Sequence, residues 1–377
     1  MRARLVRLLR GGAAAAALSL VAACSTTSKP TPAPLEAIAA PKLAERQVWS
    51  ARLDAVTFPL FVAVEGNAFT LAGSDGRLVA LAIDDGHELW RAEVGARLSA
   101  GVGSDGRYAA VVTRDNELQV LDRGRPLWHA TLASRVETAP LVAGERVFVM
   151  GVDRAVHAFD AASGARLWSF ARPGDALTLA QAGVVTAWGN TLLVGQGPRL
   201  AGLDPLDGSL RWETAIATPR GTNEVERLAD LVGPAARVGK TLCVRAFQSA
   251  VGCVDAERGT LLWSKNAGGN QAVDADADHV YGADASDRVT AWKLASGDVA
   301  WTHERFLNRG LSAPRALADA VVFGDAEGYV HFLARDSGAT LQRLPTDGTA
   351  VVGKPALAGT TLLVVTRGGG VYAFRPS

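Results

Sequence analysis

The chain repeats a unit of short apolar strands separated by turns rich in Gly and Asp. The unit is clearest over residues 146–168, which read RVFVMGVDRAVHAFDAASGARLW. An apolar strand is expected from Val147 to Val152, and a second strand from Ala155 to Phe159, with a turn at Asp153-Arg154 between them. A third strand enters at Leu167-Trp168. A period of two, bounded by turn residues, predicts short antiparallel strands.

The unit recurs at a nearly constant spacing. A Trp follows the Asp/Gly turn in most copies, and Gln342 stands in its place in a degenerate copy. The eight positions are 49, 90, 128, 168, 212, 263, 301 and 342, so the spacings are 41, 38, 40, 44, 51, 38 and 41 residues. A period near forty with about four short strands per copy is typical of the blades of a β-propeller.

The two ends of the chain predict how the ring closes. The strand at Trp49 has no partner strand before it, and the last strand, Val371 to Phe374, has no Trp strand after it. Together they complete one blade, which removes two open sheet edges. The sequence therefore predicts an all-β fold over residues 45–377. It is an eight-bladed β-propeller of four-stranded antiparallel blades, with the N-terminal strand closing the last blade.

Residues 1–23 have the pattern of a signal peptide. Arginines among the first ten residues precede an apolar run from Gly11 to Ala23, which is shorter than the roughly 20 residues that span a bilayer. The run ends in Leu20-Val21-Ala22-Ala23-Cys24, which resembles the lipobox of bacterial lipoproteins. This resemblance implies cleavage before Cys24 and lipidation of its thiol and amine, and Ser25 favours the outer membrane. An ordinary signal peptidase site is the alternative.

Residues 24–44 are expected to be a flexible linker that begins at the lipidated Cys24. They are rich in Ser, Thr, Pro and Ala, and their prolines favour an extended chain. Over the whole chain, 39 Lys and Arg nearly balance 38 Asp and Glu. This balance argues against a nucleic-acid partner, which requires a basic face. We therefore expect a domain that meets the membrane through its lipid anchor only.

Cys243 and Cys253 flank a strand–turn–strand segment of one blade. Their spacing allows them to face each other across the hairpin, so we expect a disulfide in an oxidising compartment. Two buried free thiols are the alternative.

No catalytic constellation and no metal site are expected. The six histidines are scattered over different blades, and none has a Cys or His neighbour at the spacing of zinc ligands. Asp274, Asp276 and Asp278 resemble the start of a calcium loop, but His279 replaces the required Gly and Ala285 the terminal Glu. We interpret this segment as a solvated turn and the tryptophans as packing between adjacent blades. We expect no cofactor and no enzymatic activity.

The segment Val156-His157-Ala158-Phe159-Asp160, followed by Gly164 and Trp168, resembles the PQQ-like propeller repeat. Two families carry this repeat: the quinoprotein alcohol dehydrogenases and the BamB lipoproteins. The lipobox and the linker favour the BamB family, and the adjacent cysteine pair of the dehydrogenases does not occur in the sequence. The longest repeat interval contains Glu224-Val225-Glu226-Arg227-Leu228-Ala229-Asp230, which is similar to a stretch of BamB proteins at this place.

The resemblance implies a non-catalytic scaffold on the periplasmic face of the outer membrane. Its expected partners are the POTRA domains of BamA, the other subunits of the β-barrel assembly (BAM) complex, and unfolded outer-membrane proteins. Its expected role is to aid the folding and insertion of β-barrel proteins. The alternatives are a PQQ-dependent periplasmic dehydrogenase and a generic periplasmic propeller that binds a ligand.

The resemblance also implies two loops that contact BamA. One contains Leu177 and Leu179, with an Ala following where the family has Arg. The other contains Asp230, with Val232 in place of a second Asp. Because two family charges are missing, the contact is expected to involve the neighbouring residues Glu226, Arg227 and Leu228 as well. The alternatives are that the two leucines begin the next inner strand, and that the second loop is merely solvated.

Overall fold

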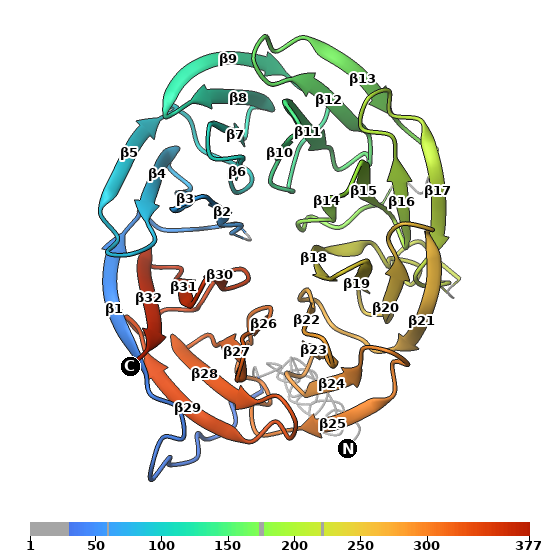
Figure 1. Cartoon of the computed structure of the whole chain (residues 1–377). Helices are drawn as coiled ribbons and strands as arrows, with labels where there is room; N and C mark the ends of the chain where they lie inside the picture. The colour runs from blue at the N-terminus through green and yellow to red at the C-terminus, as the bar shows by residue number, and fades with distance from the viewer. Residues whose placement is uncertain (1–29, 59, 173–176, 220–221) are drawn as a thin grey trace, which may run out of the picture. The chain divides into compact units, whose positions relative to one another are not determined.

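The computed structural model describes residues 30–58, 60–172, 177–219 and 222–377. The chain divides into two compact units, Met1–Pro32 and Ala33–Ser377. Eight four-stranded sheets follow one another in the second unit (Figure 1), which confirms the predicted eight-bladed all-β propeller. The expected signal peptide and the expected lipid attachment residue, Cys24, lie outside the described residues. No helix in the described ranges is long and apolar enough to cross a bilayer.

The strands of the first four blades follow in chain order. Blade 1 contains β2 (Ala63–Glu65), β3 (Ala68–Ala72), β4 (Arg77–Ala82) and β5 (Glu88–Glu93). Blade 2 contains β6 (Gly103–Ser104), β7 (Tyr108–Val112), β8 (Glu117–Asp122) and β9 (Arg125–Thr131). Blade 3 contains β10 (Leu141–Ala143), β11 (Arg146–Met150), β12 (Val156–Asp160) and β13 (Arg166–Phe170). Blade 4 contains β14 (Val185–Trp188), β15 (Thr191–Gln196), β16 (Arg199–Leu203) and β17 (Leu210–Ala215).

The remaining blades complete the ring. Blade 5 contains β18 (Leu231–Val238), β19 (Thr241–Ala246), β20 (Ala250–Asp255) and β21 (Thr260–Asn266). Blade 6 contains β22 (Asp274–Ala275), β23 (His279–Ala283), β24 (Val289–Lys293) and β25 (Val299–His303). Blade 7 contains β26 (Arg315–Ala316), β27 (Ala320–Gly324), β28 (Tyr329–Ala334) and β29 (Thr340–Pro345). Blade 8 contains β30 (Ala356–Ala358), β31 (Thr361–Val365), β32 (Gly370–Pro376) and the N-terminal β1 (Glu45–Arg52).

Blade 8 joins the two ends of the propeller. β1 pairs antiparallel with β32, with Glu45 opposite Pro376 and Trp49 opposite Ala373. Figure 1 shows β1 on the outside of β32. The predicted closure by the N-terminal strand is therefore confirmed.

Burial follows the position of a strand within its blade. The second strands are covered on both faces by neighbouring blades, so that every residue of β7 and β31 is buried. The outer strands alternate between exposed and partly covered positions, as in β5. The predicted strand from Val147 to Val152 ends earlier, at Met150, because Gly151 already belongs to the turn: its N–H donates to Ala155 O, 2.9 Å away.

The tryptophans pack between adjacent blades, as predicted. Each of the seven tryptophans of the repeat lies against the glycine of the turn between the third and fourth strands of the next blade. A Cβ at Gly208, where φ is +76°, would lie 2.5 Å from the Trp168 ring. The indole N–H of Trp168 donates to Pro205 O of the same turn at 3.1 Å. The full set of pairs is Trp49–Gly86, Trp90–Gly124, Trp128–Gly164, Trp168–Gly208, Trp212–Gly259, Trp263–Gly297 and Trp301–Gly338.

Gln342 departs from the Trp pattern for a structural reason. In blade 8 the third and fourth strands, β32 and β1, are the two ends of the chain, so no glycine turn connects them for a tryptophan to cover. Gln342 instead accepts from Glu45 N–H at 3.0 Å and donates to Glu45 O at 2.8 Å. The side chain thus pairs with the backbone of the closing strand.

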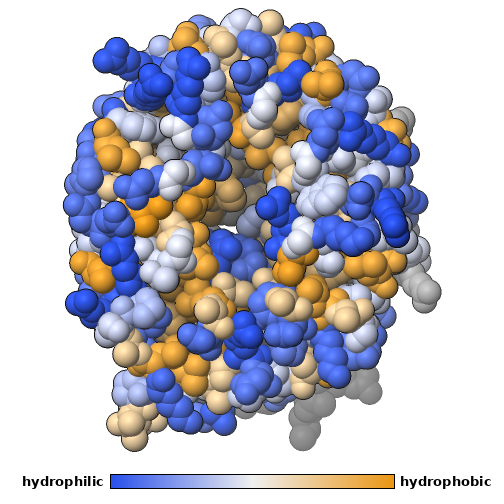
Figure 2. Space-filling model, in the orientation of Figure 1, coloured by the Kyte–Doolittle hydropathy of each residue, from blue (hydrophilic) through white to orange (hydrophobic). Residues whose placement is uncertain are grey.

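The space-filling view shows a hollow at the centre of the ring (Figure 2). A cavity of ≈ 530 Å³ is lined there by residues of the connections that precede β2, β10, β14, β26 and β30. Its walls are largely apolar, with Phe58, Leu60 and Val351 among them, and its charged lining residues are Lys354 and Arg367.

Candidate functional site

The connections between strands place the candidate residues on one side of the ring. In an antiparallel blade, the link between the second and third strands and the link from the fourth strand to the next blade leave on the same side, which we call the loop face. The turn containing Arg154 joins β11 to β12. The segment with Leu177 and Leu179 joins β13 to β14, and the insertion that ends at Asp230 joins β17 to β18. All three connections therefore belong to the loop face.

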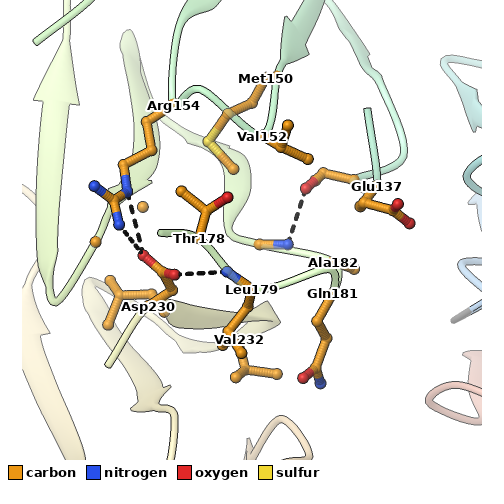
Figure 3. A pocket seen from close by; sticks show the side chains of 16 residues that line it. Glu137, Met150, Val152, Arg154, Thr178, Leu179, Gln181, Ala182, Asp230 and Val232 are labelled. Atoms are coloured by element: carbon orange, nitrogen blue, oxygen red, sulfur yellow. Dashed lines mark hydrogen bonds and ion pairs between the residues drawn. The ribbon is translucent and has the colours of Figure 1, made fainter. Parts of the chain in front are cut away.

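An ion pair ties these three connections together. Arg154 Nη2 lies 2.9 Å and its Nε 3.2 Å from Asp230 Oδ1. Asp230 Oδ2 accepts from the N–H of Leu179 at 3.0 Å, and Arg154 Nη2 donates to Leu177 O at 3.3 Å. Figure 3 shows the two side chains pointing toward each other, with the backbone of Leu179 beside them. The structure thus brings three of the predicted residues, Leu177, Leu179 and Asp230, into one site.

Arg154 is a site residue that the sequence did not reveal. It occupies the turn between β11 and β12 with φ 64°, and its carbonyl accepts from Gln196 Nε2 at 3.0 Å. The side chains of Arg154 and Asp230 are only 18% and 16% exposed. Because water is largely excluded, the pair is stronger than a surface ion pair. The predicted turn at Asp153-Arg154 was the one available signal, but nothing in it indicates a partner 76 residues away.

The insertion forms a hydrogen-bonded turn. Asn223 Oδ1 accepts from Glu226 N–H at 2.9 Å, and Glu226 Oε2 accepts from Thr222 N–H at 2.8 Å. The backbone hydrogen bond from Thr222 lowers the pKa of the Glu226 carboxyl. The exposed Glu226 carboxylate therefore already accepts a hydrogen bond within its own turn. The neighbouring Val225 is 71% exposed and presents an apolar surface to solvent.

A cleft of ≈ 300 Å³ separates the insertion from the β13–β14 connection. Its charged lining residues are four arginines and three carboxylates, namely Arg154, Arg172, Arg199, Arg227, Glu213, Glu224 and Asp230. Glu213 is paired with Arg172 and with Arg199. Leu177 and Leu228 add apolar surface to the same cleft. The cleft therefore combines apolar and charged groups, with one more arginine than carboxylate.

Of the predicted residues, Leu177, Leu179, Arg227 and Leu228 are half-buried. The two leucines precede the inner strand β14, which begins at Val185. Val232 is only 2% exposed within β18 and packs with Ala272 and Ala313. An apolar residue at position 232 therefore suits its buried surroundings.

The interpretation of residues 274–278 as a solvated turn is wrong for Asp274. Asp274 is 5% exposed, and its Oδ1 lies 2.7 Å from Lys354 Nζ. Arg315 Nη1 lies 3.6 Å from the other carboxylate oxygen. Asp274 starts the inner strand β22, where the next two blades supply these cations. Burial lowers the pKa of Lys354 to about 8. Asp278 is exposed, as expected.

Cys243 and Cys253 lie directly opposite each other on β19 and β20, and their sulfur atoms are bonded. Both residues are buried in the contact between blades 5 and 6, with Trp263 and Trp292 beside them. Within the described ranges, no three His, Cys, Asp or Glu side chains form a group that could hold a metal ion.

The fold and the tryptophan–glycine contacts define an eight-bladed propeller of PQQ-like repeats. The family model described as outer membrane protein assembly factor BamB matches residues 74–303. A BamB protein of Burkholderia pseudomallei is 38% identical over 370 residues, covering 97% of each chain. A BamB protein of Bordetella pertussis is 35% identical and covers 89% of this chain and 88% of its own. The chain belongs to the BamB family.

Solved structures agree with the fold. BamB from Moraxella catarrhalis superimposes with a TM-score of 0.80 at 24% identity, covering 88% of this chain and 99% of that one. A quinohemoprotein alcohol dehydrogenase from Pseudomonas putida gives a TM-score of 0.67 at 16% identity, covering 89% and 77%. Both likenesses concern the arrangement of the blades.

Proposed function

We propose that this protein is an outer-membrane protein assembly factor, a non-catalytic scaffold that binds the POTRA domains of BamA. Its relatives carry the name outer membrane protein assembly factor. In this proposal Cys24 carries the lipid that anchors the protein to the periplasmic face of the outer membrane. The propeller then holds the other BAM subunits together while β-barrel proteins fold and insert.

The observation that carries the proposal is the joining of three loop-face connections by the Arg154–Asp230 pair. Loops that must order themselves on binding lose affinity, because the ordering entropy opposes association. Here the bonds from Asp230 to Arg154 and to Leu179 N–H already fix the loops relative to one another. A preorganised surface of this kind suits a folded partner domain better than an extended chain.

The chemistry of the surface supports a protein partner. Leu177 and the exposed Val225 offer apolar contact, and Arg172 and Arg227 provide charge beside them. Interfaces typically combine a few buried apolar or arginine anchors with a polar rim. Asp230, by contrast, already bonds to Arg154 and to the N–H of Leu179 within the site. Its expected role is to position the loops, while Leu177, Val225 and Arg227 touch the partner.

Affinity purification of the tagged full-length lipoprotein from its own envelope in detergent tests the proposal. We expect a POTRA-containing barrel protein to co-purify with the wild type. Recovery should fall at least tenfold for Leu177→Asp and for Val225→Asp. Val299→Asp is the matched control, because Val299 is 59% exposed on the outer strand of blade 6, away from the site.

Equal recovery with all three variants would contradict the site. Recovery of the wild-type protein without any barrel protein would contradict the function itself. Co-purification of a c-type cytochrome would favour the dehydrogenase alternative.

A further inference from the structure

The residues just before the first strand lie along the propeller. The N–H of Ala33 donates to Leu307 O at 2.9 Å, and Ala33 O accepts from Arg309 Nη1 at 2.9 Å. Both backbone polar groups of Ala33 are thus bonded to the connection between blades 6 and 7. Leu35 packs against the core cluster that contains Trp301 and Phe306.

The following residues continue across blade 7. Glu36 Oε2 lies 2.8 Å from Arg305 Nη1, and Glu36 O accepts from Arg343 Nη1 at 3.1 Å. Lys42 N–H donates to Leu341 O of the outer strand β29 at 2.9 Å. The N–H of the C-terminal Ser377 donates to Ala44 O at 2.8 Å. Backbone and side-chain contacts therefore occur at both ends of residues 33–44.

Two of the three arginines that contact this segment, Arg309 and Arg343, are held in turn by a buried Asp–His pair. Arg309 is 4% exposed, and its Nε donates to Asp325 Oδ2 at 2.9 Å. The same oxygen lies 2.9 Å from His331 Nε2, and both Asp325 and His331 are fully buried. Arg343 Nε lies 3.4 Å from the other ring nitrogen of His331. A buried Asp–His pair thus orients both arginines, so they form a built docking site instead of a chance surface contact.

We propose that residues 33–44 are a docked strap, so that the tether to the membrane consists of residues 24–32 only. The first residue of the strap, Ala33, is bonded to Leu307 and Arg309. These two residues lie in the connection from β25 to β26, which belongs to the loop face. The tether therefore leaves the propeller on the face that carries the Arg154–Asp230 site. This inference deepens the proposed function and rests on it, because it takes Cys24 as the lipidated residue.

The strap changes the reach of the anchor. At most about 3.5 Å per residue, nine tether residues span roughly 30 Å, whereas the whole of residues 24–44 would span roughly 70 Å. With a docked strap, the loop face is confined to a layer close to the membrane. A partner domain bound at that face must then stand next to the bilayer.

Hydrogen exchange of the full lipoprotein in detergent tests the docking. We expect the amides of Ala33 and Lys42 to exchange at least tenfold more slowly than the same residues in an isolated peptide of residues 30–44, because both are hydrogen-bonded to the propeller. Leu35→Asp should abolish this protection, and Ala39→Asp, at an exposed position of the same segment, should keep it. Exchange of Ala33 and Lys42 in the wild type at the rate of that peptide would overturn the strap.

Energy transfer in liposomes tests the reach. A fluorescent donor would be attached to the Cys of a Ser286→Cys variant, at an exposed position in the loop-face turn between β23 and β24. The acceptor fluorophores would be attached to lipid headgroups, so that energy transfer reports the distance between the loop face and the membrane. We expect transfer to fall when Leu35→Asp frees the strap and to stay unchanged with Ala39→Asp. Unchanged transfer with a freed strap would overturn the tether assignment. Failure of the wild type to bind liposomes would instead contradict the lipid anchor of the proposed function, which the exchange experiment does not depend on.

Discussion

The Arg154–Asp230 pair is expected to hold the candidate site in shape, and Asp230→Ala is the perturbation that tests this. The substitution removes the acceptor of two hydrogen bonds from Arg154 and one from Leu179 N–H. It leaves the Arg154 guanidinium, whose side chain is 18% exposed, with its bond to Leu177 O. The cost is therefore the loss of the ion pair with a largely buried guanidinium, together with the lost hydrogen bond from Leu179 N–H.

The exposed fractions set the magnitude. Exposed ion pairs contribute about 0–1 kcal/mol, while removing one partner of a fully buried pair costs about 3–5 kcal/mol. At 18% and 16% exposure the pair lies between these limits. We therefore expect Asp230→Ala to lower the free energy of unfolding by about 2–3 kcal/mol. Asp230→Asn should cost less, because it keeps an acceptor for Leu179 N–H.

Urea unfolding followed by tryptophan fluorescence measures this cost, and hydrogen exchange of residues 177–184 measures the loosening of the loop. Asp54→Ala is the matched control, because it breaks the Arg77–Asp54 pair, in which both side chains are 48% exposed. That control should cost less than about 1 kcal/mol. The reasoning would be refuted if Asp230→Ala cost no more than the control and left the exchange of residues 177–184 unchanged.

Three further predictions concern closure, acid stability and the disulfide. Gln342→Ala removes both hydrogen bonds to Glu45 and should lower the free energy of unfolding in urea by about 1–3 kcal/mol; no change would mean that the side chain does not secure β1. Burial lowers the pKa of His331 below its ordinary value of 6.5, so the unfolded chain takes up a proton below about pH 6.5 that the folded chain resists. Stability should therefore fall as the pH drops below that value, and a melting-temperature profile from pH 7.5 to 5 should be flatter for His331→Gln; identical profiles would contradict this. Replacing Cys243 and Cys253 together by Ala should cost about 2–3 kcal/mol in the chain-entropy model, and mass spectrometry without reductant should find neither thiol free.

Much of the fold was predictable because each blade repeats the same local requirement. The turn glycine must lack a side chain where the tryptophan of the preceding blade covers it, as at Gly208 beneath Trp168. This requirement leaves the spacing of about forty residues in the sequence. Gln342 looked like a degenerate copy, yet it occurs where the chain ends replace a turn. The exception to the repeat thus marks the closure of the ring.

The site was predictable only in part. The resemblance indicated Leu177, Leu179 and Asp230, and the structure brings them together. Arg154 was missed because its contact depends on the packing of different blades, and pairs so distant in sequence leave no periodic signal. Residues 24–44 were expected to be a flexible linker, because their composition is typical of an extended chain. Composition gives no sign of the contacts that Ala33, Leu35 and Lys42 make with the propeller.

Site-specific photo-crosslinking in the intact envelope tests the central claim most directly. A photoreactive amino acid would replace Val225 at the candidate site or Val299 on the outer strand of blade 6, which are 71% and 59% exposed. We predict that the probe at 225 forms an adduct with a POTRA domain of the barrel-forming subunit and that the probe at 299 does not. Equal labelling from both positions, or an adduct from 299 alone, would contradict the assignment of the loop face as the partner-binding surface.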